Sequence, residues 1–202
     1  MSVIDYHKRE INYKIVHYGV PMAGKCFSLD LIHASVPPEL RGKRVRSSYI
    51  SGGTKNIESF DFKLPKLSPE LKGFSRRFYL YTINGSVFYD YIRTKILEDV
   101  DGIVFVVDSQ VERMEYNSEM LQRLDEGLKE HGYDINTIPL VFQYNKRNYP
   151  NAASMEDIRK VLNLGKRPEF EAIVSTEFGE IEGQGVLDAL KTVIKLILDT
   201  PP

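Results

Sequence analysis

Residues 14–29 read KIVHYGVPMAGKCFSL, and this stretch decides the fold expected for the whole chain. The apolar, β-branched run Ile15–Tyr18 predicts a strand, and the segment that follows the loop has apolar residues at helical spacing. Between them, Gly19 and the pair Gly24-Lys25 have the spacing G-x-x-x-x-G-K of a phosphate-binding loop. A strand, a glycine-bounded loop and a helix in this order predict a present or ancestral site for a phosphorylated ligand.

Each part of this loop has a physical role. Glycines let backbone N–H groups turn toward phosphate oxygens, Lys25 supplies a cation, and the helix N-terminus adds partial positive charge. Cys26 stands where Ser or Thr is expected, and a thiol is a poor ligand for Mg²⁺. We interpret Cys26 as a tolerated small residue; an oxidisable thiol with a lowered pKa is the alternative. The residues expected to surround the phosphates are Gly19, Ala23, Gly24, Lys25, Cys26 and Phe27.

The composition is that of an ordinary globular protein. The 202 residues suit one domain, 1–202, and a hydrophobic fraction of 42% with a net charge of -1 gives no sign of a nucleic-acid or membrane surface. The single cysteine excludes an internal disulfide framework. No signal peptide or membrane-spanning run is recognisable, so we expect a cytoplasmic protein without direct membrane insertion.

Strand and helix signals alternate along the rest of the chain. Strands are expected at Phe60–Leu64, Arg77–Ile83, Gly102–Asp108, Ile138–Tyr144 and Phe170–Val174. Helices are expected at Val87–Val100, Glu112–His131 and Gly185–Leu198. A further helix is expected to begin at Ser154, with Val161 facing inward. The pattern predicts an α/β fold: a mostly parallel six-stranded sheet with one antiparallel edge strand and helices on both faces.

Ligands of such sheets bind beyond the carboxyl ends of the strands, so the residues there form the candidate site. Asp108 is expected to be a structural acid that ends a strand; the alternative is a role in magnesium binding, either as a ligand or through another ligand. His17 is expected to be a packed histidine rather than a ligand. The segments placed at this edge are Gly19–Cys26, Thr82–Ser86, Asp108, Asn145–Asn148 and Ser175–Thr176.

The order of these motifs resembles a Ras-type small GTPase, and more narrowly the bacterial MglA family of polarity and gliding-motility GTPases. The resemblance covers nearly the whole chain. Its most specific pieces are Arg9–Asn12 (REIN), Phe78–Thr82 (FYLYT), Val100–Val106 (VDGIVFV), Asp108–Met114 (DSQVERM) and Gln143–Arg147 (QYNKR). The resemblance implies a P-loop small-GTPase fold with bound GDP or GTP.

The departures from the family pattern fall on its chemistry. Asn56 and Ile57 occupy the positions of an Arg-Thr pair, and Ser86 replaces the water-orienting glutamine. Phosphoryl transfer by these proteins depends on positioning and charge stabilisation, so intrinsic GTP hydrolysis is expected to be slow or absent, with no confident catalytic residue. Cys26 and Thr54 are the candidates for the magnesium position, and the lack of the usual hydroxyl ligands predicts poor Mg²⁺ binding.

Base recognition is altered as well. The resemblance assigns base contacts to Asn145, Lys146, Asn148, Ser175 and Thr176. Asn148 replaces the aspartate that accepts hydrogen bonds from guanine N1–H and the exocyclic amino group. An amide opposes one of these donors with its own NH₂, which weakens guanine binding and suits xanthine better.

Two functions follow, and a third is retained. The preferred one is a pseudo-GTPase or very weak GTPase that acts as a protein-interaction regulator of the polarity type. The alternative is a working guanine-nucleotide switch with slow or partner-assisted hydrolysis; a different P-loop enzyme, such as a kinase, is the third. The resemblance implies a Roadblock-type regulatory partner and polar localisation through partners. The interface is expected at Phe78, Tyr81, Phe88 and Tyr89.

Overall fold

The structure is a computed structural model that describes residues 3–47, 57–64, 73–83, 90–162, 165–177 and 180–200. Its strands are β1 (Val3–Asp5), β2 (Glu10–Gly19), β3 (Val45–Ser47), β4 (Ile57–Leu64), β5 (Ser75–Ile83), β6 (Gly102–Asp108), β7 (Leu140–Asn145), β8 (Glu169–Glu171), β9 (Ile173–Glu177) and β10 (Glu180–Gln184). Its helices are α1 (Lys25–Ser35), α2 (Asp90–Lys95), η1 (Val111–Arg113, a 3₁₀ turn), α3 (Met114–Glu130), α4 (Met155–Leu162) and α5 (Val186–Asp199).

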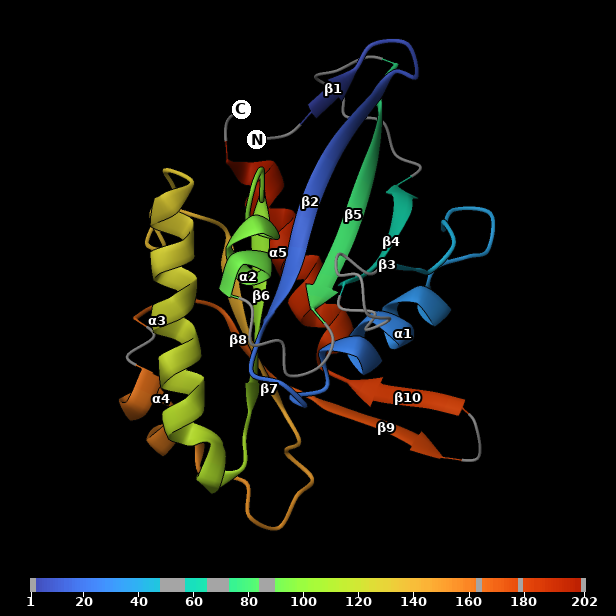
Figure 1. Cartoon of the computed structure of the whole chain (residues 1–202). Coiled ribbons are helices and arrows are strands. Elements are labelled where there is room, and N and C mark those ends of the chain that lie inside the picture. Colours follow the sequence, from blue (N-terminus) through green and yellow to red (C-terminus); the bar gives the residue numbers. More distant parts are fainter. Residues whose placement is uncertain are drawn as a thin grey trace.

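The main sheet confirms the predicted fold class. Its strand order is β3-β4-β5-β2-β6-β7-β8 (Figure 1). Strand β1 pairs with the first residues of β2, before the part of β2 that pairs with β6. The five strands β5, β2, β6, β7 and β8 run parallel, and β4 pairs antiparallel with β5. The short strands β1 and β3 add two antiparallel pairings that the sequence pattern did not indicate.

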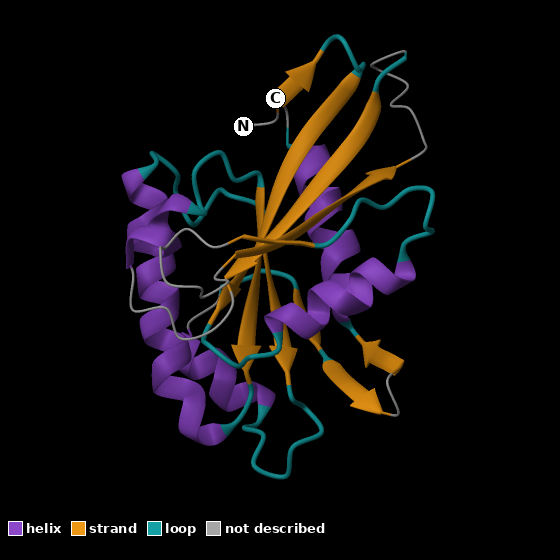
Figure 2. Cartoon of the chain, turned by 45° about the vertical axis from the view of Figure 1, so that its right-hand side comes forward, coloured by secondary structure: helices purple, strands orange, loops and turns teal. Residues whose placement is uncertain are grey.

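Helices cover both faces of the sheet. Figures 1 and 2 show α1 and α5 on one side and α3 with α4 on the other. A close approach of α5 explains Gly102 at the start of β6, where a Cβ would lie 2.7 Å from Ile197 Cδ1 and 2.9 Å from Val193 Cγ2. All seven residues of β6 and all six of β7 are buried, as expected of central parallel strands covered on both faces.

Three local expectations were wrong in detail. The strand expected at Phe170–Val174 is divided at Ala172: β8 ends the main sheet, and β9 pairs with β10 in a separate two-stranded ribbon. Val161 is 42% exposed rather than inward, because α4 has only eight residues and Ile158 and Leu162 form its buried stripe. The helix expected at Val87–Val100 is shorter: α2 ends at Lys95, and turns occupy residues 96–99. Residues 87–89 lie outside the described part of the chain.

The residue before α4 caps the helix with its side chain. Ser154 Oγ accepts a hydrogen bond of 3.1 Å from the backbone N–H of Asp157 and donates one of 2.6 Å to the Asp157 carboxylate. Across the part of the chain that is described, no helix has both the length and the apolar character needed to cross a bilayer.

Candidate functional site

The glycine-bounded loop between β2 and α1 has the backbone that its sequence predicted. Gly19 and Gly24 have φ values of +140° and +93°, and Met22 also takes a positive φ of +66°. The N–H groups of such a backbone turn inward, which forms a concave site for anions. Helix α1 begins at Lys25, directly after the loop, and its N-terminus faces the same place.

Lys25 is the buried cation of the loop. Its side chain is 6% exposed, and Nζ donates hydrogen bonds to the carbonyl oxygens of Gly19 at 3.1 Å and Val20 at 2.7 Å. Burial, with a smaller contribution from the nearby Arg93 guanidinium, lowers the pKa of Lys25 to about 8. An ammonium has three donors, so the site fits a phosphate oxygen as the additional acceptor. These residues fit a nucleotide phosphate.

This pKa predicts how phosphate binding changes with pH. Lys25 loses its charge as the pH rises through about 8, while a bound phosphate raises its pKa and holds the proton. Affinity for GDP is therefore expected to fall more than about tenfold between pH 7.5 and 9.5, by calorimetric titration. Lys25→Arg is the matched control, because its guanidinium stays charged; the same decline in both proteins would assign the effect to other groups.

Asn145 at the end of β7 ties the loop to the sheet. Its Nδ2 donates a 2.7 Å hydrogen bond to the Ala23 carbonyl, and its Oδ1 accepts one of 2.7 Å from Gln143 Nε2. Gln143 also bonds Ser28 Oγ in α1 at 2.9 Å, so one amide positions both the loop and the helix. Gln143 was missed as a site residue, although an amide in the middle of the buried strand LVFQYN is a signal.

Asp108 has the structural role that was predicted. It is 1% exposed, and its Oδ2 accepts a 2.6 Å hydrogen bond from Lys146 Nζ. Arg113 approaches the same oxygen, with Nε at 3.6 Å, and its Nη2 donates to the Pro21 carbonyl at 2.9 Å. Asp108 therefore organises two cations beside the loop. Arg113 was not predicted, because its role depends on the 3₁₀ turn before α3.

Of the two positions expected to hold Mg²⁺, the described residues include Cys26. Among the described residues, no three His, Cys, Asp or Glu side chains lie close enough to hold a metal ion. Burial, with the nearby Glu58 carboxylate, raises the pKa of Cys26 to about 11. The thiol is therefore neutral at pH 7, which contradicts the alternative of an oxidisable thiol with a lowered pKa. Thr54, Asn56 and Ser86 lie outside the described residues.

The base-contact candidates occupy three places. Asn145 and Lys146 lie at the loop, and Asn148 is exposed two residues beyond Lys146. Ser175 and Thr176 are inside β9, where their backbones pair with Glu182 and Ile181, rather than beyond the end of a main-sheet strand. Phe27 is 48% exposed in the first turn of α1.

The predicted partner interface is wrong at Phe78. This side chain is 0% exposed, and its ring stacks on Phe62 at 5.6 Å and on Tyr13 at 5.0 Å between centroids. Side chains alternate along β5, which places Phe78 in the core and Tyr79 and Tyr81 on the other face. Tyr81 is partly exposed, while Phe88 and Tyr89 lie outside the described residues.

His17 is a core histidine, as predicted. It is 1% exposed in β2, and burial lowers its pKa to about 3, with the nearby Lys25 acting in the same direction. Its carbonyl accepts a 3.0 Å hydrogen bond from Thr82 Oγ1, which joins the ends of β2 and β5. The ring is neutral across the physiological pH range.

Comparisons with known proteins agree with the fold. The family model "Arf: ADP-ribosylation factor family" matches residues 75–197. The Arl6 BBS3 small GTPase of Trypanosoma brucei, solved with the nucleotide analogue GppNp, aligns with a TM-score of 0.63 over 94% of this chain and 99% of that one; at 15% identity this shows the fold alone. The "Mutual gliding-motility protein MglA" of Myxococcus xanthus (strain DK1622) is 48% identical over 198 residues, or 98% of this chain and 96% of that protein. The chain therefore belongs to the MglA family of small GTPases in the Ras superfamily.

Proposed function

We propose that this chain is an MglA-type regulator that binds a guanine or related purine nucleotide weakly and hydrolyses GTP slowly or not at all. The observation that carries the proposal is the preformed phosphate loop with the buried cation of Lys25 beside a neutral Cys26 thiol. The loop supports binding of the phosphates. The thiol lacks the hard oxygen that a magnesium-bound triphosphate requires.

Slow hydrolysis follows from what the side chains offer to the reaction. Lys25 and the N-terminus of α1 stabilise negative charge on phosphate oxygens. Ser86 is too short to orient a water as a glutamine does, and Asn56 brings no charge to the position of an arginine that contributes on the order of 10³–10⁵ in rate. The chain therefore retains ligand binding and lacks the groups that accelerate phosphoryl transfer.

The cellular role is proposed from the relative. The Myxococcus xanthus protein is a gliding-motility protein by name, and we extend to this chain a role in gliding motility or cell polarity through protein partners. A Roadblock-type regulator is the proposed partner, and the proposed location is the cytoplasm, with enrichment at a pole through partners.

The alternative is a working nucleotide switch. Asn145 bonds the loop at the Ala23 carbonyl and is itself bonded by Gln143, while Lys146 pairs with Asp108 at the end of the neighbouring strand; this order supports a switch. In this case a partner supplies the missing charge, and the neighbouring loops rearrange with the phosphate state.

One experiment separates these functions. The purified protein is denatured, any released nucleotide is identified by chromatography, and nucleotide-free protein is titrated with GDP and GTP with and without Mg²⁺. Lys25→Met is the matched control, since it removes the cation and retains side-chain bulk. Micromolar or weaker binding that Lys25→Met abolishes, with no measurable turnover, is the expected result. Stoichiometric copurified nucleotide and GTP turnover would establish the switch, and no binding at all would contradict nucleotide recognition.

A further inference from the structure

A second buried cation lies near the phosphate loop. Arg93, the fourth residue of α2, is 7% exposed, and its Nη1 donates a hydrogen bond of 3.2 Å to Met120 Sδ in α3. Helices α2 and α3 pack together beside β6 (Figure 1). A thioether is a weak acceptor, and within the described part of the chain the guanidinium forms no ion pair with a carboxylate. The charge of Arg93 is therefore largely uncompensated.

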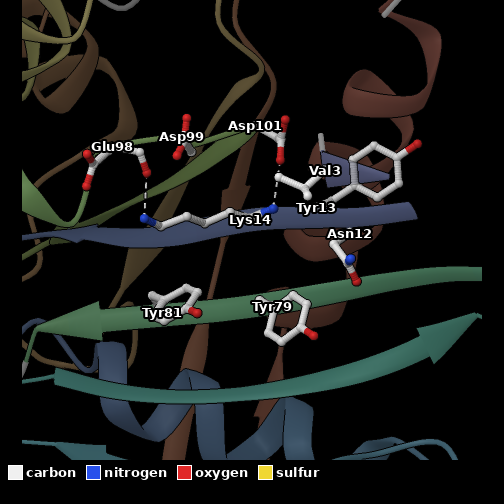
Figure 3. A pocket seen from close by; sticks show the side chains of 9 residues that line it. All are labelled: Val3, Asn12, Tyr13, Lys14, Tyr79, Tyr81, Glu98, Asp99 and Asp101. Atoms are coloured by element: carbon white, nitrogen blue, oxygen red, sulfur yellow. Dashed lines mark hydrogen bonds between the residues drawn. The ribbon is translucent and has the colours of Figure 1, made fainter. Parts of the chain in front are cut away.

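Lys14 shows how this chain compensates another cation away from the surface. Its Nζ donates a 2.6 Å hydrogen bond to the backbone carbonyl of Glu98. The carboxylates of Glu98, Asp99 and Asp101 surround it in a hollow of about 220 Å³ (Figure 3). Arg93 has no such set of acids among the described residues. A charge that is buried without compensation is unfavourable, so its presence indicates an anion that comes from outside the chain.

Arg93 and Lys25 lie close to each other. The guanidinium lowers the pKa of Lys25, although burial has the larger effect. Lys25 Nζ donates its hydrogen bonds to the carbonyl oxygens of Gly19 and Val20, which carry no formal charge. Two like charges in a low-dielectric interior repel each other, and an anion that contacts both removes this repulsion. The phosphate loop is the place where such an anion binds.

The buried carboxylates around the loop are already paired with other cations. Asp108 accepts a hydrogen bond of 2.6 Å from Lys146 Nζ. On the side of α1, Glu58 and Asp30 both pair with Arg44 Nη2, at 2.5 Å and 2.7 Å. That side has two carboxylates for one guanidinium, whereas the side of α2 has an arginine without a carboxylate. An additional phosphate is therefore better accommodated toward α2.

We propose that Arg93 binds the terminal phosphate of a nucleoside triphosphate held in the loop, and so favours GTP over GDP without a metal ion. This inference rests on the proposed function, because the loop must first bind a nucleotide. The spacing of the loop brings Lys25 to the β- and γ-phosphates, so a guanidinium beside Lys25 reaches the phosphate that GDP lacks. A guanidinium stays charged and donates to two phosphate oxygens at once. This contact strengthens binding and orients no attacking water, so it is compatible with slow hydrolysis.

The test compares triphosphates with diphosphates in the absence of divalent metal. Nucleotide-free full-length protein in EDTA is titrated with GTP and GDP by calorimetry. GTP is expected to bind at least about tenfold more tightly, because it adds a charge-assisted contact. XTP and XDP are expected to show the same ratio, because Arg93 acts on the phosphate and not on the base.

Arg93→Met isolates the guanidinium. This variant is expected to lose the preference for GTP and to keep the GDP affinity of the wild type. Its midpoint of thermal unfolding without nucleotide is expected to be unchanged or higher, since an apolar side chain replaces a buried charge. Arg93→Lys keeps the charge without the planar fork and is expected to restore part of the preference. Arg123→Met, at an exposed position of α3, is the matched control for a lost arginine.

Lys25→Met separates this inference from the proposed function. No binding of any of the four nucleotides to the folded wild-type protein would contradict nucleotide recognition, and the role of Arg93 with it. Binding that Lys25→Met abolishes, but with equal affinities for GTP and GDP, would leave the proposed function standing and overturn the role of Arg93. A GTP preference that Arg93→Met retains, or a lower unfolding midpoint with unchanged GTP binding, would assign Arg93 to packing against Met120 instead.

Discussion

Replacing Asn148 by Asp and Cys26 by Thr in one protein is expected to strengthen magnesium-dependent GDP binding by at least about tenfold. The aspartate accepts hydrogen bonds from guanine N1–H and from the exocyclic amino group, where the asparagine opposes one donor with another. A mispaired buried donor costs about 1–3 kcal/mol, and the restored charge adds to the gain. The threonine hydroxyl supplies the hard oxygen that the neutral Cys26 thiol lacks.

The single variants Asn148→Asp and Cys26→Thr separate the two contributions to this gain in GDP affinity. Asn148→Asp alone is expected to improve GDP binding and to weaken XDP binding, since xanthine has a carbonyl where guanine has its amino group. Cys26→Thr alone is expected to alter the dependence on Mg²⁺ without changing the choice of base. Calorimetric titration with both nucleotides, with and without the metal, measures each effect. Unchanged GDP affinity in the folded double variant would contradict the assignment of Asn148 to the base.

Gly19→Ala is expected to lower the free energy of unfolding by about 3 kcal/mol or more, as measured by urea denaturation. Gly19 has a φ of +140°, and a Cβ there would lie 2.2 Å from the carbonyl oxygen of Val106. Gly19 pairs with Val106 in the register of β2 and β6, so this oxygen cannot retreat without separating two central strands. The clash adds to the strain of the positive φ.

Gly132→Ala is the matched control for that strain. Gly132 has a φ of +79°, and a Cβ there would meet nothing within 4 Å. Its loss of stability is expected to be about 1 kcal/mol, the cost of the backbone conformation alone. Equal losses at the two positions would show that the close approach to Val106 does not constrain the loop.

The large elements were predictable because their own residues specify them. The run from Gly102 to Val107 is apolar throughout, so a strand buried on both faces is the simple solution. The same holds for α5, whose apolar residues recur at helical spacing. Strands β1 and β3 have three residues each and exist because longer strands offer them a free edge. Such pairing is a property of the tertiary structure, and no local pattern announces it.

In the candidate site, too, the features that depend on single residues were predictable, and those that depend on distant contacts were not. The spacing of Gly19, Gly24 and Lys25 predicted the loop because backbone conformation and charge are properties of those residues themselves. Gln143 was not found, since its importance comes from reaching Ser28, 115 positions earlier in the chain. Phe78 was assigned to the surface because residue type alone does not tell which face of β5 is covered; the alternation along the strand decides it.

The tie from Gln143 and Asn145 to the loop has a kinetic consequence. A loop that is already shaped for phosphate needs little ordering on encounter, so association is expected to proceed at an ordinary rate. If recognition of the base and the metal is weakened as proposed, nucleotide dissociation is expected to be fast and the residence time of the bound nucleotide short. A protein of this kind exchanges its nucleotide spontaneously and reports the momentary nucleotide pool, without the memory that a slowly exchanging GTPase holds until an exchange factor acts.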